Sequence, residues 1–170
     1  MGIKQFTYYS LAFSLLFLLF SCENIFAPAI DNSISGIVIS DQKSIDGVFI
    51  NFKYAYTFKD TSVYSNLLTD DFVFTFRNYE SGYDESWDKP TEMRTTARLF
   101  ENTQKLEVIW NNTILDIGDS LQRNIKRSFN LTITFNPSNI VRLNGFADMN
   151  LRRTTTNDQW RISKWKDETF

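Results

Sequence analysis

The second half of the chain alternates apolar and polar residues over long stretches. Residues 129–135 and 141–151 both follow this pattern, and the turn formers at 136–139 separate them. Successive side chains of a strand point to opposite faces, so a period of two predicts antiparallel strands with one face buried. Residues 106–110 and 160–166 predict two more strands of the same sheet. In the first stretch, the residues expected to face inward are Phe129, Leu131, Ile133 and Phe135.

The first half of the chain is predicted to be mainly helical. Apolar residues recur at helical spacing over residues 45–56 and 63–68, and Lys59-Asp60-Thr61 separates these two helices. A third helix is expected from Asp88 to Asn102, with Pro90 in its first turn. Its inner face is expected to carry Met93, Ala97 and Phe100.

Between the second and third helices, the composition predicts a strand at residues 72–76 and a polar loop at residues 78–87. Helices first and an antiparallel meander last indicate the α+β class. We therefore expect one domain over residues 44–170, in which a strongly curved antiparallel sheet wraps on three N-terminal helices. Residues 22–43 are expected to form a tether ahead of it.

Residues 1–21 have the parts of a secretory signal peptide. Lys4 gives a positive start, residues 11–20 are apolar apart from Ser14, and the small residue Ser21 precedes Cys22. The apolar run is about half of the ~20 residues that a membrane-spanning helix needs. The alternative is an uncleaved membrane anchor.

Leu19-Phe20-Ser21-Cys22 resembles the lipobox of bacterial lipoprotein signal peptides. The resemblance implies that Cys22, the chain's only cysteine, receives a diacylglyceryl group and becomes the first residue of the mature chain. Two or three acyl chains would hold the protein on a membrane, since each buried methylene contributes about 0.8 kcal/mol. Glu23 follows in place of the aspartate that retains enterobacterial lipoproteins in the inner membrane, so we expect the outer membrane of the cell envelope. The alternative is a structural cysteine after an ordinary signal peptide.

Composition excludes several classes of function. The chain has no histidine, which excludes Ser-His-Asp and Cys-His catalysis and nearly all zinc enzymes. Eighteen basic and twenty acidic side chains give a net charge of −2, which does not suit a nucleic-acid binder. We expect no cofactor and no metal.

Residues 52–60 end the first helix at Lys59-Asp60, and Asp70-Asp71 precedes a strand. These features, together with the closing segment 160–167, resemble the nuclear transport factor 2-like superfamily, which includes ketosteroid isomerase and the SnoaL-like polyketide cyclases. The resemblance covers residues 44–168. It implies a cystatin-like cone, in which a bent sheet and three helices enclose a pocket that opens at one end.

In the isomerases of that superfamily, a tyrosine on the first helix donates to the oxyanion, and a carboxylate on the first strand moves the proton. The resemblance places these roles at Phe52 and Phe76, which can neither donate nor titrate. General acid–base catalysis needs a positioned group with a tuned pKa. We therefore assign no catalytic residue.

The resemblance implies an aromatic pocket, and we expect six residues to line it. They are Phe52, Tyr56, Phe74, Phe76, Trp87 and Trp110. The preferred hypothesis is a membrane-anchored, non-catalytic module that binds a small apolar ligand or another protein, with a homodimer formed through the sheet. The alternative is a periplasmic enzyme of the SnoaL-like or ketosteroid-isomerase-like type. An ionisable group inside the cone, such as Asp116 or Asp148, would favour the enzyme.

The lipobox-like segment predicts lipidation at Cys22. Labelled palmitate should enter the wild-type protein and should not enter Cys22→Ser, because the thiol is the nucleophile that accepts the lipid. Labelling and membrane partition of the serine variant would show that the lipoprotein hypothesis is wrong.

Overall fold

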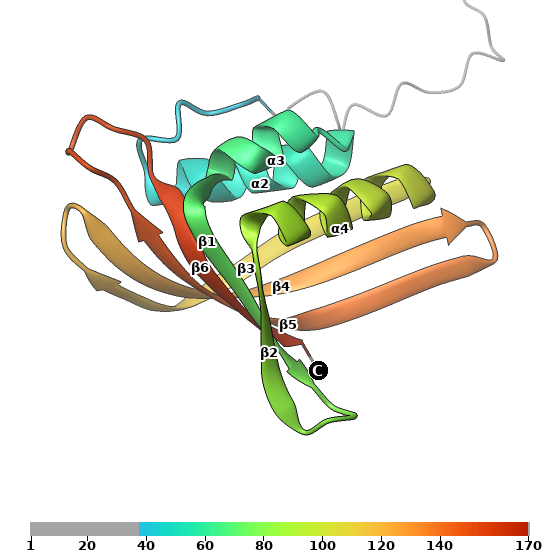
Figure 1. The fold of residues 1–170 in the computed structure, drawn as a ribbon. Coiled ribbons are helices and arrows are strands. Elements are labelled where there is room, and N and C mark those ends of the chain that lie inside the picture. Colours follow the sequence, from blue (N-terminus) through green and yellow to red (C-terminus); the bar gives the residue numbers. More distant parts are fainter. Residues whose placement is uncertain (1–37, 170) are drawn as a thin grey trace, which may run out of the picture. The chain divides into compact units, whose positions relative to one another are not determined.

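The computed structural model describes residues 38–169, and this part of the chain contains three helices and six strands (Figure 1). The lipobox-like segment and Cys22 lie outside the described residues. None of the described helices has the length and apolar character needed to cross a membrane. The helices are α2 (Ile45–Phe58), α3 (Thr61–Leu67) and α4 (Lys89–Asn102). The strands are β1 (Leu68–Asn78), β2 (Tyr83–Asp88), β3 (Lys105–Gly118), β4 (Gln122–Asn136), β5 (Asn139–Arg152) and β6 (Arg161–Thr169).

Short polar side chains start each of the three described helices. Ser44, Asp60 and Asp88 are the N-caps of α2, α3 and α4, and each side chain accepts a hydrogen bond from a backbone N–H of the first turn. Lys59 ends α2 in the left-handed conformation, with φ at 57°. The helix break expected at residues 59–61 is therefore confirmed.

The strands form one sheet with the order β2-β1-β6-β5-β4-β3. Every neighbouring pair is antiparallel except β1 and β6, which are parallel. The α+β class and the curved sheet are confirmed, and the parallel pair corrects the expectation of a wholly antiparallel sheet. It arises because β6, the last strand, enters between β5 and β1 and has no hairpin to β1.

The prediction of a polar loop at residues 78–87 is wrong, because this segment contains β2 and the turn that joins it to β1. The two strands pair from Val73 with Asp88 to Asn78 with Tyr83. Five of the six β2 residues are exposed, so the strand carries no apolar alternation that would reveal it. Gly82 supplies the positive φ, 75°, in the connecting turn.

The three helices lie along one face of the sheet, which bends around them (Figure 1). Strand β3 contributes to this shape, since its pairing with β4 shifts register between Trp110 and Thr113 and again before Leu115. Such irregularities bend a strand and increase its twist. The concave face and the helices enclose the core.

The last residues before α2 are bonded into the domain. Gln42 is buried, and its side-chain Nε2 donates to the backbone carbonyl of Trp160 at 2.6 Å. The backbone carbonyl of Gln42 accepts from the backbone N–H of Trp160 at 2.9 Å. The amide Nδ2 of Asn51 in α2 donates to Gln42 Oε1 at 3.1 Å. Residues at the end of the expected tether thus connect α2 to the start of β6.

The expected inward face of residues 129–135 is confirmed. Phe129 and Ile133 are 7% and 8% exposed, while Leu131 and Phe135 are half-buried against the same core. The alternation in β4 therefore identified the face that packs toward the helices.

Phe129→Ala should destabilise the domain by roughly 3–5 kcal/mol, because a buried ring is lost and a cavity is left. The Phe129 ring lies 6.0 Å from that of Trp110, centroid to centroid. Urea unfolding measures the change. Ile114→Ala is the matched control, since Ile114 is 59% exposed on neighbouring β3 and its truncation should change stability by no more than about 0.5 kcal/mol. Equal stability of the two variants would contradict the assigned face.

Candidate functional site

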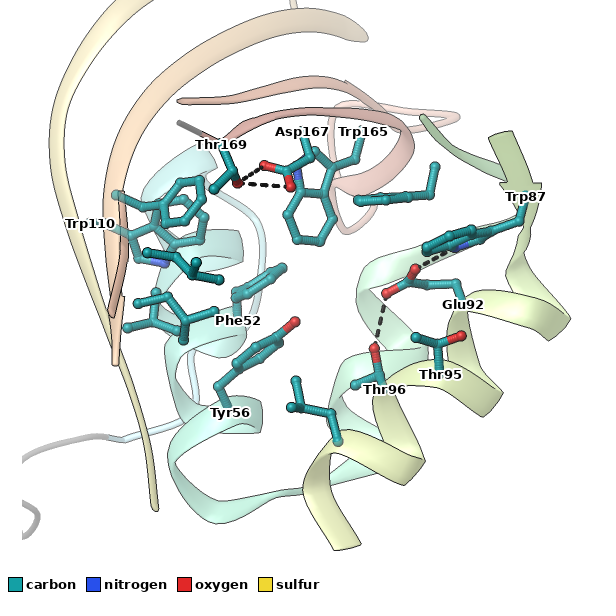
Figure 2. Close-up of a pocket in the computed structure, with 16 residues that line it drawn as sticks. Phe52, Tyr56, Trp87, Glu92, Thr95, Thr96, Trp110, Trp165, Asp167 and Thr169 are labelled. Atoms are coloured by element: carbon teal, nitrogen blue, oxygen red, sulfur yellow. Dashed lines mark hydrogen bonds between the residues drawn. The ribbon is translucent and has the colours of Figure 1, made fainter. Parts of the chain in front are cut away.

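A cavity of about 180 Å³ lies between the helices and the concave face of the sheet (Figure 2). Helices α2 and α4 form part of its wall, and all six strands contribute the rest. Sixteen residues line it, namely Phe52, Tyr56, Phe74, Trp87, Glu92, Thr95, Thr96, Leu99, Val108, Trp110, Phe129, Leu131, Leu143, Trp165, Asp167 and Thr169.

Aromatic rings make up much of this wall and hold one another in place. The Phe52 ring stacks on Tyr56 at 4.7 Å between centroids, and it meets Trp110 and Trp165 edge-on at 5.2 and 5.4 Å. Such pairs contribute about 0.5–1.5 kcal/mol each beyond the area that they bury. The wall is therefore built from packed rings of α2, β3 and β6.

Five of the six residues expected to line the pocket lie on the cavity wall, and Phe76 does not. Phe76 packs next to the wall, with its ring 6.1 Å from Phe74 and 5.0 Å from Trp87. Phe74 and Trp87 stack on each other at 4.7 Å. Trp87 lies on β2, in the segment that was expected to be a loop.

Glu92 is a buried carboxylate, 4% exposed, that the sequence analysis missed. Its Oε1 accepts hydrogen bonds from the hydroxyls of Tyr64 at 2.6 Å and Thr96 at 2.9 Å. Its Oε2 accepts from Trp87 Nε1 at 2.6 Å. A buried charge is tolerated when donors satisfy its oxygens, and here three donors from α3, α4 and β2 do so.

The inner face of α4 therefore differs from the expected one. The structure buries Glu92, Thr96 and Phe100, which are four residues apart, whereas Met93 and Ala97 are half-buried. The expected face was assigned from the apolar residues alone. It therefore left out Glu92 and Thr96, whose side chains are hydrogen-bonded to each other inside the core. A regular spacing of four along a helix was the signal that could have identified them.

Two tyrosine hydroxyls near Glu92 stay protonated. Burial, followed by the charge of Glu92, raises the pKa of Tyr56 well above its ordinary value. Burial also raises the pKa of Tyr64, and the neighbouring Tyr56 and Glu92 add to the shift. The Tyr56 hydroxyl points into the cavity (Figure 2).

Asp167 is the second carboxylate on the wall, and it lies near the end of β6. Trp165, Asp167 and Thr169 occupy alternate positions of this strand and all line the cavity. The Thr169 hydroxyl donates to Asp167, with oxygen separations of 2.7 and 2.9 Å to its two carboxylate atoms. Burial raises the pKa of Asp167, the Thr169 hydrogen bond opposes this shift, and the charge of Glu168 adds to it.

The carboxylates that the sequence analysis singled out lie elsewhere. Asp116 is exposed and accepts a hydrogen bond from Arg123 Nε at 2.8 Å. Asp148 accepts from Asn124 Nδ2 at 2.7 Å. Neither residue lines the cavity. Asp167 was not singled out, although the alternation that continues from Trp165 places it on the same face of the strand.

The three tryptophans on the wall offer ring carbons rather than N–H donors. Trp87 Nε1 is used by Glu92. The indole nitrogens of Trp110 and Trp165 have almost no accessible surface, and the described structure gives them no hydrogen-bond partner. Within residues 38–169, no lysine or arginine lines the cavity. The cavity surface therefore combines aromatic carbons, aliphatic groups, a few hydroxyls and two carboxylates.

The cavity has room for a molecule of about one ring. Apolar cavities on the order of 150 Å³ hold benzene, whereas pockets for drug-sized ligands measure roughly 300–1,000 Å³. The present volume of about 180 Å³ is close to the first of these. A polycyclic molecule such as a steroid exceeds the space in this conformation.

No protein-family model and no curated protein sequence matches this chain. Solved structures resemble it at low sequence identity. A conserved protein from Planctomyces limnophilus is 17% identical, with a TM-score of 0.65 over 76% of this chain and 96% of that one. A proposed scytalone dehydratase from Novosphingobium aromaticivorans is 10% identical, with a TM-score of 0.65 over 75% and 83% of the two chains.

A proposed dehydratase of the nuclear transport factor 2-like family from Streptomyces avermitilis is 17% identical, with a TM-score of 0.58 over 75% of this chain and 94% of that one. At identities this low, these likenesses show the fold alone. The domain has the nuclear transport factor 2-like cone fold that its sequence resembles.

The raised pKa of Asp167 predicts how stability depends on pH. Below the ordinary value of 3.8 the carboxyl is protonated in both the folded and the unfolded chain, so it contributes no penalty. As pH rises through the folded-state pKa, the protein must ionise a carboxyl that burial disfavours, and stability is lost. Asp167→Asn should therefore be more stable than wild type near pH 7 and about equally stable near pH 3.

Urea unfolding at the two pH values measures this difference. Asp84→Asn is the control, because Asp84 is ion-paired with Arg77 and Lys166 and its neutralisation should not raise stability near pH 7. A less stable Asp167→Asn protein near pH 7 would mean that the carboxylate is stabilised in the fold.

Proposed function

We propose that the domain binds a small, mainly apolar molecule of about one ring and holds it without changing it. The observation that carries this proposal is the cavity of about 180 Å³, whose wall is mostly aromatic and aliphatic. Burial of apolar surface contributes roughly 25 cal/mol per Å², so contact with the apolar wall gives useful affinity to a small ligand.

Two features favour binding without chemistry. The positions at which the resemblance places the oxyanion donor and the proton carrier hold Phe52 and Phe76. Glu92 accepts three hydrogen bonds from its neighbours and is fixed by them. A carboxylate that is held in this way supports the wall rather than a reacting molecule.

The second candidate function is an enzyme, and Asp167 is the residue that favours it. It is a carboxylate on the cavity wall with a raised pKa, which is a property of general bases. The Tyr56 hydroxyl points into the same space (Figure 2) and is a donor for an oxyanion. The reaction class suited to this pair is proton transfer next to a carbonyl group.

We further propose that the domain is attached to the cell envelope through lipid on Cys22, with the outer membrane as its site. The lipobox-like sequence at residues 19–22 supports this. A homodimer through the sheet is the proposed assembly. Support for it comes from large apolar side chains that are exposed on the strands, including Ile109, Ile114 and Ile117 of β3 and Ile140 of β5.

Calorimetric titration with toluene tests the binding proposal. The full chain carrying Cys22→Ser, which has no lipid acceptor, should bind toluene, and Leu99→Trp should weaken binding at least about tenfold by filling the cavity. Leu121→Trp is the control, because Leu121 is 38% exposed and lies outside the cavity. Absence of toluene binding, or equal binding by Leu99→Trp, would contradict the proposal.

The same protein incubated with cyclohex-3-enone separates the two candidates. A binding module returns the enone unchanged. Conversion to cyclohex-2-enone that Asp167→Asn abolishes would replace the proposed function with the enzyme.

A further inference from the structure

Strand β6 separates its charged side chains between the two faces of the sheet. Lys166 and Glu168, on either side of Asp167, both form ion pairs. Lys166 pairs with Asp84 at 3.1 Å, and Glu168 pairs with Lys126. Asp167 points the other way and lines the cavity.

Asp167 has no cation among the described residues. No lysine or arginine nitrogen of the described chain lies within 4.0 Å of its carboxylate, and none lines the cavity. The one hydrogen-bond donor that the described chain gives it is the Thr169 hydroxyl. A carboxylate has about four acceptor positions, so Asp167 keeps capacity for further donors.

The aromatic rings around Asp167 suit a positive charge. Trp87, Trp110 and Trp165 line the same cavity, and their N–H groups are either used by Glu92 or without accessible surface. The cavity therefore meets the carbon atoms of these rings, and an aromatic ring attracts a cation that lies over its face. Ring faces together with a carboxylate are the usual recognition elements for organic ammonium groups.

Other charge states fit this site less well. An anion would enter a space that holds Asp167 and Glu92 and to which the described residues add no basic side chain. A neutral ligand would fill the volume and leave Asp167 without a counter-charge. A small ammonium ion supplies N–H donors and positive charge to Asp167, and its apolar part contacts the rings.

We propose that the ligand of this cavity is a small organic ammonium ion, with its charged nitrogen at Asp167 and its apolar group of about one ring among the tryptophans. This inference rests on the proposed binding function and adds the ligand's charge to it. The geometry that carries it is the inward, cation-free carboxylate of β6 within an aromatic wall (Figure 2). Glu92, already held by three donors, adds negative potential without contacting the nitrogen.

Three ligands of one size test the charge preference. Benzylamine is an ammonium ion at neutral pH, benzyl alcohol is its neutral counterpart, and benzoate is an anion. Calorimetry on the full chain with Cys22→Ser should give benzylammonium an affinity at least about tenfold above that of benzyl alcohol, with benzoate the weakest. Equal or tighter binding of benzyl alcohol would overturn the proposal in favour of a neutral ligand.

Asp167→Asn should remove the preference for benzylammonium over benzyl alcohol, because the carboxylate charge that attracts the nitrogen is lost. Glu168→Gln is the matched control: it removes the same charge from the adjacent residue, which faces away from the cavity, and should keep the preference. Retention of the preference in Asp167→Asn, or its loss in Glu168→Gln, would show that net charge rather than this site attracts the cation.

Toluene binding distinguishes a failure of the proposed binding function from a failure of the proposed ligand class. A protein that binds toluene and shows no preference for benzylammonium has the proposed function without the proposed ligand class. A protein that binds none of these ligands has neither.

Discussion

The buried carboxylate of Glu92 is the interaction on which the site depends. It joins Tyr64 of α3, Thr96 of its own helix and Trp87 of β2 through three hydrogen bonds. Hydrogen bonds to a charged group contribute about 1.5–3 kcal/mol, and a buried charge that loses its donors is strongly destabilising. The network therefore fixes how α4 sits against α3 and the β1–β2 hairpin, and it fixes one side of the cavity.

The opposite side of the cavity depends on ring packing. Phe52 lies at the centre of this packing, because its ring contacts Tyr56 and Tyr64 of the helices and Trp110 and Trp165 of the sheet. Aromatic side chains have few rotatable bonds, so a ring held by several neighbours keeps its place. A polar network on one side and packed rings on the other leave a space that the side chains do not fill.

In strand β6, successive side chains alternate between the two faces of the sheet, so ion-paired residues lie on one face and cavity-lining residues on the other. Lys166 and Glu168 lie on the face where their ion pairs form, while Trp165, Asp167 and Thr169 line the cavity. Exposed ion pairs contribute little to stability, at about 0–1 kcal/mol each. The inward carboxylate differs from them, since burial raises its pKa and the described chain offers it no cation.

The sequence by itself determined the class of fold, the helix break at residues 59–61, the inward face of β4 and most of the aromatic wall. The helix break and the inward face of β4 follow from local rules, namely capping, helical spacing and strict alternation, which act within a few residues. The aromatic wall was an expectation from the resemblance to the nuclear transport factor 2-like superfamily. The β2 strand, the parallel β1–β6 pair and the partners of Glu92 and Asp167 depended on tertiary structure. Glu92 meets Tyr64 across 28 positions of the chain, and Asp167 faces inward because β6 joins the middle of the sheet. Spacing along α4 and β6 indicates the face on which each carboxylate lies, but contacts between distant residues leave no periodic pattern, so only the folded chain decides which groups meet these carboxylates.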